Sequence, residues 1–257
     1  MFRPSEGNWY YEGSTSGFAA IHFGESTDIP TPGDYDHDGK TDISVYRPST
    51  GFWYRINSSD NTVLFVNFGL NGDIPQAGDY DGDHKDDQAV FRPSNGTWYW
   101  LRSIDNQQAG MQFGQNGDRP VSGDYDGDGR QDLAVFRGGI WYRFNTANSS
   151  YTAEQFGLDT DIPVHADYNG DNREDIAVFR PSNGNWYFHL SGTGIFTGIH
   201  WGQNGDVPVP GDYDGDNLDE VAVYRDGIWY INNTMTGSTA LPFGLASDIP
   251  IPKMYIP

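Results

Sequence analysis

The 257-residue sequence contains no cysteine, which excludes disulfide bonds and thiol catalysis. It also lacks any segment apolar enough to span a bilayer, and no helical periodicity of useful length occurs in it. The chain is nevertheless long enough to bury ample core, as one large or two small domains. These absences leave a folded protein without membrane-spanning helices and without disulfide staples.

Basic residues are scarce: 15 Lys and Arg face 36 Asp and Glu, and the formal net charge is −21. Such an excess repels nucleic acids and anionic membranes, so we expect no nucleic-acid partner and no membrane insertion. Gly-x-Ser-x-Gly, His-Glu-x-x-His and phosphate-binding motifs are absent, and the six histidines fall at scattered registers: His22, His37, His84, His165, His189 and His200. The sequence therefore predicts a protein without enzymatic activity.

Aromatic residues (15%) and glycine (33 residues) are abundant, which indicates an all-β protein with many turns. The most informative stretch, Gly123 to Arg137, reads Gly-Asp-Tyr-Asp-Gly-Asp-Gly-Arg-Gln-Asp-Leu-Ala-Val-Phe-Arg. Numbered from Asp124, it has carboxylates at positions 1, 3, 5 and 9 and glycine at position 6. Acids at alternate positions of a tight loop converge on one hard cation, and Ca²⁺ takes about six to eight oxygen ligands.

The same loop has two other possible interpretations. An EF-hand needs Glu at position 12 and a helix on each side, but position 12 is Val135 and the flank Leu133 to Arg137 is typical of a strand. A solvated Asp-Gly turn is the other alternative, because Asp bonds its own backbone and Gly supplies positive φ. One copy would not decide between a turn and a cation site.

The loop occurs five times, starting at Asp34, Asp79, Asp124, Asp167 and Asp212, at steps of 45, 45, 43 and 45 residues. Positions 1, 3, 5 and 9 of the loops hold 19 of the 36 carboxylates, and five calcium ions would reduce the net charge to about −11. Recurrence favours calcium, about five ions per chain. The predicted ligands, with the position-7 carbonyl included, are Asp34, Asp36, Asp38, Lys40, Asp42; Asp79, Asp81, Asp83, Lys85, Asp87; Asp124, Asp126, Asp128, Arg130, Asp132; Asp167, Asn169, Asp171, Arg173, Asp175; and Asp212, Asp214, Asp216, Leu218, Glu220.

Four other landmarks share this period, and each occurs six times. They are a Trp-Tyr pair, an aromatic-Gly pair, an Asp followed by X-Pro, and an Arg. The tryptophans are Trp9, Trp53, Trp98, Trp141, Trp186 and Trp229; the aromatics before Gly are Phe23, Phe68, Phe113, Phe156, Trp201 and Phe243; the aspartates are Asp28, Asp73, Asp118, Asp161, Asp206 and Asp248; the arginines are Arg3, Arg47, Arg92, Arg137, Arg180 and Arg225.

Each repeat is predicted to contain four short strands, for example at residues 29–35, 42–47, 52–56 and 63–68. Four strands in about 43–45 residues match one blade of a β-propeller. The expected fold is a single all-β domain over 1–257, a six-bladed β-propeller of four-stranded antiparallel blades. The units are 1–28 plus 248–257, 29–73, 74–118, 119–161, 162–206 and 207–247.

The two partial units at the chain ends sum to one blade. Met1 to Ser5 aligns with Val45 to Ser49, and Asp248 to Tyr255 aligns with Asp28 to Tyr35. We therefore expect a C-terminal first strand to join the N-terminal strands, which would hide both sheet edges of an open array.

The Phe-Gly pair, the Gly-Asp-Tyr-Asp-Gly-Asp-Gly loop and the following Asp-Leu-Ala-Val resemble FG-GAP/VCBS repeats, found in integrin α-subunit propellers and in many bacterial secreted proteins. The resemblance implies a calcium-stabilised propeller with the metal between the first two strands of a blade. This sequence departs from the motif at His84, Asn172 and Asn217 (position 6) and at Asn169 (position 3). WD40 signatures are absent, and the nine-residue period of RTX repeats does not fit.

Three groups of side chains have alternative interpretations. The Trp-Tyr pairs are expected to pack between blades rather than to stack on sugars. The six Arg and six Asp residues are expected to form one ion pair per blade rather than an anion site. Trp100, outside the repeated Trp-Tyr register, is the candidate ligand-stacking residue, with a solitary surface aromatic as the alternative.

Calcium loops of this open kind bind in the range of about 0.1–1 mM, an extracellular supply. We therefore expect a secreted or cell-surface protein whose leader has been removed. Nucleic acid and membrane are excluded as partners, and a glycan or a protein is expected. The predicted role is a monomeric, non-enzymatic binding module for a glycan or a protein, as in adhesion; fungal lectins among FG-GAP propellers suggest the glycan by analogy. The alternatives are a polysaccharide lyase or glycosidase with a funnel site, and a structural spacer. The variable loops between third and fourth strands are expected on the calcium-loop face.

Overall fold

The computed structural model of the chain describes residues 1–13, 17–233 and 237–252. Strands, turns and irregular segments make up this part of the chain, and it contains no helix. Accordingly, nothing in these ranges provides a helix long and apolar enough to cross a membrane. The predicted all-β class is confirmed.

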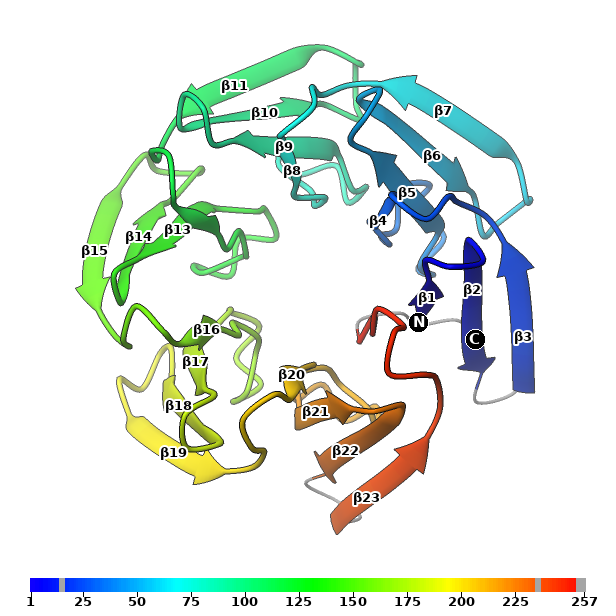
Figure 1. The fold of residues 1–257 in the computed structure, drawn as a ribbon. Helices are drawn as coiled ribbons and strands as arrows, with labels where there is room; N and C mark the ends of the chain where they lie inside the picture. The colour runs from blue at the N-terminus through cyan, green and yellow to red at the C-terminus, as the bar shows by residue number, and fades with distance from the viewer. Residues whose placement is uncertain (14–16, 234–236, 253–257) are drawn as a thin grey trace. The chain divides into compact units, whose positions relative to one another are not determined.

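Twenty-three strands form six antiparallel sheets, and within each sheet the strands lie in chain order (Figure 1). The strands are β1 (Phe2–Arg3), β2 (Asn8–Gly13) and β3 (Gly17–His22); β4 (Ile29–Pro30), β5 (Ile43–Arg47), β6 (Phe52–Ile56) and β7 (Val63–Asn67); β8 (Ile74–Pro75), β9 (Gln88–Arg92), β10 (Thr97–Leu101) and β11 (Gln108–Gln112); β12 (Arg119–Pro120), β13 (Leu133–Arg137), β14 (Ile140–Phe144) and β15 (Tyr151–Gln155); β16 (Ile162–Pro163), β17 (Ile176–Arg180), β18 (Asn185–His189) and β19 (Phe196–His200); β20 (Val207–Pro208), β21 (Val221–Arg225), β22 (Ile228–Asn233) and β23 (Gly237–Pro242).

The pairing register repeats from sheet to sheet. Tyr46 on β5 lies opposite Trp53 on β6, and Phe91 on β9 lies opposite Trp98 on β10 in the same way. In the first sheet Phe2 lies opposite Trp9, so β1 is the counterpart of β5. The fold is a six-bladed β-propeller with antiparallel blades of four short strands, as predicted.

The strands belong to two compact units, β1–β12 in the first and β13–β23 in the second. In the first unit Tyr46, Trp53 and Phe68 pack against Val90 of the next sheet. In the second unit Phe136 and Trp141 pack with Ile176 and Val178, and a further cluster joins the fifth and sixth sheets. Each core thus lies between the faces of successive sheets.

Burial differs systematically along a blade. The second strand is buried on both faces: Leu133, Ala134, Val135 and Phe136 of β13 are at most 1% exposed. Its continuous apolar run follows from this double packing. The fourth strand is open to solvent, and every residue of β19 is exposed. The fourth strand is therefore the solvent-exposed edge of its blade.

The repeated tryptophans are core residues, as predicted. All six are at most 6% exposed. Each indole N–H donates a hydrogen bond of 2.7–2.9 Å to the carbonyl of the aromatic residue in the aromatic-Gly pair, for example Trp98 to Phe113. A buried indole needs such an acceptor, and this bond ties the third strand to the end of the fourth.

The predicted ion pair between the repeated Arg and Asp is present between Arg47 and Asp28, Arg92 and Asp73, Arg180 and Asp161, and Arg225 and Asp206. In each, Nε and Nη2 donate to the two carboxylate oxygens, at 2.8 Å in the Arg92–Asp73 pair. All six arginines also lie 4.3–4.7 Å from the ring centre of the tyrosine in the Trp-Tyr pair. The arginine is held between a carboxylate and an aromatic face, which is a structural role.

The first strand of a blade is shorter than predicted, and the predicted closing strand at the C-terminus extends past the described residues. The first strand of a blade was expected over residues 29–35, but β4 ends at Pro30. Proline has no N–H, so Pro30 and Pro32 cannot donate to the ladder. After β4 the pairing continues only through the hydrogen bond from the Thr31 N–H to the Ser44 carbonyl and through the Gly33–Asp42 bridge. The predicted closing strand at the C-terminus includes residues 253–257, which lie outside the described residues, and the first sheet has three described strands.

Candidate metal sites

Each acidic loop is closed at its neck by a β-bridge between the residue before position 1 and the residue at position 9. The bridges are Gly33–Asp42, Gly78–Asp87, Gly123–Asp132, Ala166–Asp175 and Gly211–Glu220. The loop thus connects the first and second strands of its blade. All five copies have the same frame, although their side chains differ.

The position-1 aspartate organises the loop backbone. Oδ1 of Asp34 accepts hydrogen bonds from the backbone N–H groups of His37 (2.7 Å) and Asp38 (3.2 Å), and Oδ2 accepts one from Gly39 (2.9 Å). Equivalent bonds occur in the other loops, as from Asn172 to Asp167. A negative charge satisfies N–H groups that the turn leaves without strand partners.

Positions 4 and 6 adopt positive φ in every loop. Glycine occupies most of these positions, but His37, His84, Asn172 and Asn217 adopt φ between 61° and 67°. Asn and His are among the residues that tolerate this region best. The four non-glycine residues therefore keep the loop conformation. Of the departures from the repeat motif, only Asn169 at position 3 of the fourth loop changes a predicted side-chain ligand.

The position-9 acid is buried. Asp42, Asp87, Asp132, Asp175 and Glu220 are at most 2% exposed. One oxygen accepts the N–H of the position-2 tyrosine, at 3.1 Å between Tyr35 and Asp42. Burial raises the pKa of the Asp87 carboxyl to about 7 and that of Asp132 to about 6. The protein therefore stabilises the negative charge at this position less than water does.

Residues just after the third strand complete the site, and the sequence prediction missed them. The backbone N–H of Ser58 donates to Asp42 (2.7 Å), and its hydroxyl donates to Asp38 (2.9 Å). Ser103 and Ser191 repeat both contacts, and the N–H of Thr146 bonds Asp132. The recurrence of Ser or Thr after the third strand in four repeats was the available signal. As expected, the loop between third and fourth strands lies on the calcium-loop face.

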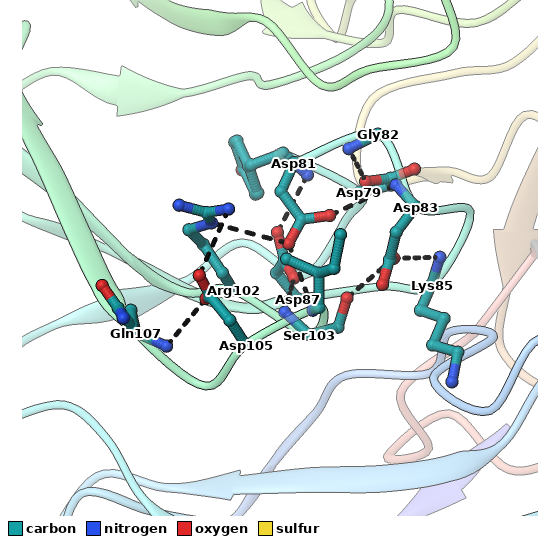
Figure 2. A network of polar contacts seen from close by, with 12 residues as sticks. Asp79, Asp81, Gly82, Asp83, Lys85, Asp87, Arg102, Ser103, Asp105 and Gln107 are labelled. Carbon is teal, nitrogen blue, oxygen red and sulfur yellow. Dashed lines mark hydrogen bonds and ion pairs between the residues drawn. The ribbon is translucent and has the colours of Figure 1, made fainter.

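The second loop shows the complete network (Figure 2). Asp79, Asp81, Asp83 and Asp87 gather in one place, and Ser103 and Arg102 approach from the segment that follows β10. The Arg102 guanidinium lies 3.9 Å from the Asp81 carboxylate and 3.4 Å from Asp105. Asp79, Asp81 and Asp87 nevertheless keep carboxylate oxygens within 4.8 Å of one another.

Four loops bring three acids together with ligand oxygens within 4.8 Å of one another. These groups are Asp34, Asp36, Asp38; Asp79, Asp81, Asp87; Asp124, Asp126, Asp132; and Asp212, Asp214, Glu220. Oxygens bound to one Ca²⁺ at 2.3–2.6 Å are at most about 5 Å apart. Oδ1 of Asp36 and Oδ2 of Asp214 are buried and accept no hydrogen bond from the described residues. The donor set therefore suits a hard divalent cation.

The fourth loop differs because its position 3 is an amide. Nδ2 of Asn169 donates to Oδ1 of Asp175 (3.2 Å) and to the Ser191 carbonyl (3.3 Å). An N–H donor thus satisfies the position-9 carboxylate that faces other acids in the other loops. Within the described residues, no group of three acids forms here.

At position 7, where a main-chain carbonyl ligand is predicted, the structure shows hydrogen bonds of the backbone N–H groups. The backbone N–H groups of Lys40, Lys85, Arg173 and Leu218 donate to the position-5 carboxylate of the same loop at 2.9–3.1 Å. Ligation through their carbonyl oxygens, and through that of Arg130, stays a prediction.

Trp100 occupies a repeated structural position rather than an extra one. It stacks on Tyr80 at position 2 of the second loop, with ring centres 5.5 Å apart. Arg55, Arg143 and Phe188 occupy the corresponding position in their blades and lie 5.2, 5.4 and 4.7 Å from Tyr35, Tyr125 and Tyr168. This packing explains Trp100 without a bound sugar, and its role in ligand stacking stays a prediction.

Comparisons with known proteins agree with this architecture. Residues 167–223, which include the fourth and fifth acidic loops, match the FG-GAP-like repeat. A search of curated protein sequences finds no significant match.

Among solved structures, the chain is similar to virginiamycin B lyase from Staphylococcus aureus, with 10% identity, a TM-score of 0.57, and coverage of 93% of this chain and 75% of the lyase. It is also similar to an Agrocybe aegerita lectin that recognises non-reducing terminal N-acetylglucosamine, with 14% identity, a TM-score of 0.60, and coverage of 91% and 73%. At these identities the similarity shows the fold alone. The chain is a six-bladed β-propeller that carries the FG-GAP-like repeat, as its loop motif predicted.

Proposed function

We propose that calcium ions bind the five acidic loops and stabilise a propeller that acts as a non-enzymatic binding module. The observation that carries the calcium assignment is the set of buried carboxylate oxygens without donors, Asp36 Oδ1 and Asp214 Oδ2, each within a cluster of acids. An unpartnered buried carboxylate is costly, and a bound cation removes that cost.

Metal analysis and thermal unfolding test this assignment together. We expect close to five equivalents of calcium per chain at millimolar calcium, and a marked fall of the melting temperature after chelation with EDTA, because three or four carboxylates per loop then repel one another. Magnesium at the same concentration is expected to restore less, because it requires tighter octahedral geometry. Protein that binds no calcium, or whose unfolding does not respond to EDTA, would refute the proposal.

The proposed setting is secreted or cell-surface, because open loops of this type need calcium at about 0.1–1 mM. The partner, a glycan or a protein, is expected at the loops after the third strands, since they differ among blades and lie beside the cation sites. The lectin with the same fold supports a glycan by analogy only. Binding to immobilised glycans with and without calcium is the direct measurement.

A polysaccharide-active enzyme is the alternative, and one cluster favours it. Glu154 accepts a hydrogen bond from Arg143 (3.0 Å) and contacts Nδ1 of His189, which stacks on Phe196. A carboxylate beside a histidine can act as an acid–base pair. Cleavage of a polysaccharide that is lost on Glu154→Gln, with calcium content unchanged, would establish this alternative and overturn the non-enzymatic role.

A further inference from the structure

A cleft of about 250 Å³ lies in the first unit, between the sheet of β4–β7 and the sheet of β8–β11. Arg55 of β6 and Leu64 and Val66 of β7 line one side; Lys85, Asp86 and Gln88 line the other. The volume is just under the roughly 300–1,000 Å³ of sites for drug-sized ligands. It therefore suits a single small ring rather than an extended chain.

Arg55 has no acceptor in this cleft. Its Nε is buried without a hydrogen-bond partner, and among the described residues no carboxylate or carbonyl accepts a bond from its guanidinium group. Its contact is with the face of Tyr35, 5.2 Å from the ring centre. A guanidinium carries five N–H donors in a planar fork that matches a carboxylate, so most of its hydrogen-bonding capacity is available.

A second blade of the same protein shows how this position is otherwise satisfied. Arg143 of β14 is the counterpart of Arg55; its Nε also has no hydrogen-bond partner, but its Nη2 bonds Glu154 at 3.0 Å. Glu154 lies opposite Trp141, as Val66 lies opposite Trp53, so Glu154 and Val66 are equivalent positions. Where the fourth strand has Glu, the arginine is paired; where it has Val66, the arginine faces the cleft without a carboxylate.

The other groups in the cleft restrict the ligand further. Oδ2 of Asp86 already accepts the N–H of Asp34 at 2.9 Å, whereas Lys85 adds a second positive charge and Gln88 adds an amide. Leu64 lies directly opposite Arg55 across the strand pair and is 39% exposed. The cleft thus combines two cationic side chains and the Asp86 carboxylate with hydrogen-bonding groups and an apolar wall, and this combination matches a hydroxylated ring that carries one carboxylate.

We propose that this cleft binds a uronic acid sugar, with the ring carboxylate on the Arg55 guanidinium and the C–H face of the ring against Leu64 and Val66. The inference deepens the binding role proposed above and rests on it, but it does not depend on which loops hold calcium. It assigns the ligand to one inter-sheet cleft rather than to a site repeated in all blades, because the free arginine is a feature of this blade.

Titration calorimetry of the calcium-loaded protein with galacturonate, glucuronate, glucose and glucose 6-phosphate tests this assignment. We expect binding of a uronate and at least about tenfold weaker binding of glucose, since one charge-assisted contact is worth more than a factor of ten. Tighter binding of glucose 6-phosphate than of both uronates would show a phosphate site and overturn the proposal. So would the absence of uronate binding by protein that has its full calcium content, whereas loss of calcium itself would refute the proposed function instead.

Three variants locate the site. Arg55→Gln should weaken uronate binding about tenfold or more, and Val66→Glu should abolish it by supplying the carboxylate that Arg143 has in Glu154. Arg143→Gln is the matched control and should leave uronate affinity unchanged. If Arg55→Gln and Val66→Glu both bind uronate as the wild type does, the proposal is wrong.

A measurement on the wild-type protein covers the case in which these variants fold poorly. The Arg55 Nε–H resonance in a ¹H–¹⁵N NMR spectrum should shift downfield as uronate is added, because a buried donor without a partner gains an acceptor. A resonance that does not move at saturating uronate would overturn the assignment.

Discussion

At the residue scale, the fourth loop differs from the other proposed metal sites because an amide replaces a carboxylate at position 3. Asn169 places an N–H donor on Asp175, where the other loops have an acid in the same position. A cation and an N–H donor compete for the same carboxylate oxygen. The fourth loop should therefore be the weakest of the five proposed calcium sites.

We expect Asn169→Asp to raise the calcium affinity of this loop by about tenfold, because the substitution removes the competing donor and adds a charged ligand. Calcium titration at limiting concentration should then show a fifth tight equivalent. Asn183→Asp is the matched control, since it adds the same charge in an exposed turn, where Asn183 bonds the Tyr187 hydroxyl. An equal gain in both variants would mean that net charge alone is responsible.

The buried position-9 acids give the calcium-free protein a pH dependence. Burial raises the pKa of Asp87 to about 7 and that of Asp132 to about 6, above the value of about 3.9 in an unfolded chain. A raised folded-state pKa means that the folded protein binds more protons, so stability falls as pH rises between about 4 and 7.

With EDTA present, the free energy of unfolding should therefore decrease by a few kcal/mol from pH 5 to pH 7.5. Asp87→Asn should reduce the size of this decrease, because it removes one of the titrating groups. Saturating calcium should reverse the direction, because ligand carboxylates must be deprotonated. Denaturant titrations at three pH values measure all three effects, and stability that rises with pH in EDTA would contradict the expectation.

At the scale of the element, close approach between two turns fixes each blade. Gly96 of the Pro-Ser-Asn-Gly turn has a φ of +65°, and a Cβ there would lie 2.2 Å from the Gly114 carbonyl oxygen of the Phe-Gly pair. Gly117 also has positive φ (+92°), but a Cβ there meets nothing within 4 Å. A side chain at Gly117 would therefore cause backbone strain alone, whereas a side chain at Gly96 would cause backbone strain and a steric clash.

Gly117→Ala should cost about 1–2 kcal/mol of stability from the left-handed conformation alone. Gly96→Ala should cost at least about 2 kcal/mol more, because the neighbouring backbone must also move. Chemical denaturation of both variants in calcium provides the comparison. Equal losses would show that the approach of the two turns contributes no additional constraint.

At the scale of the whole molecule, the sequence predicts that its two ends complete one blade. The first sheet has three described strands, and β1 at its edge is the counterpart of β5, which has β4 beside it. An unpaired edge next to a buried strand promotes aggregation.

Removal of residues 249–257 should therefore cause aggregation or a loss of stability throughout the chain rather than a local change. Size-exclusion chromatography and thermal unfolding measure both outcomes. A truncation of residues 255–257 is the milder control. A monomeric protein without residues 249–257 and with unchanged melting would show that the two ends do not pair.

The sequence by itself determined the repeat, the number of blades and the acidic loops. Spacing of 43–45 residues identifies each blade, and the alternation of Asp in a loop, with a residue that tolerates positive φ at position 6, follows from local backbone requirements. Local rules of this kind act within one repeat and need no knowledge of what packs against it. The same recurrence in every repeat predicts structural roles for Trp98 and Arg92.

The tertiary structure alone decided which side chains each repeat brings to its loop and which remain unpaired. Ser103 reaches Asp87 and Asp83 from across the blade, Trp100 covers Tyr80, and Arg143 meets Glu154 whereas Arg55 meets Val66. These contacts join residues that lie far apart within one repeat, on different strands and loops of the same blade, so they depend on strand register and on side-chain packing across the blade. The order of residues in a repeat does not show which of them meet, because the contacts arise only when the strands are paired.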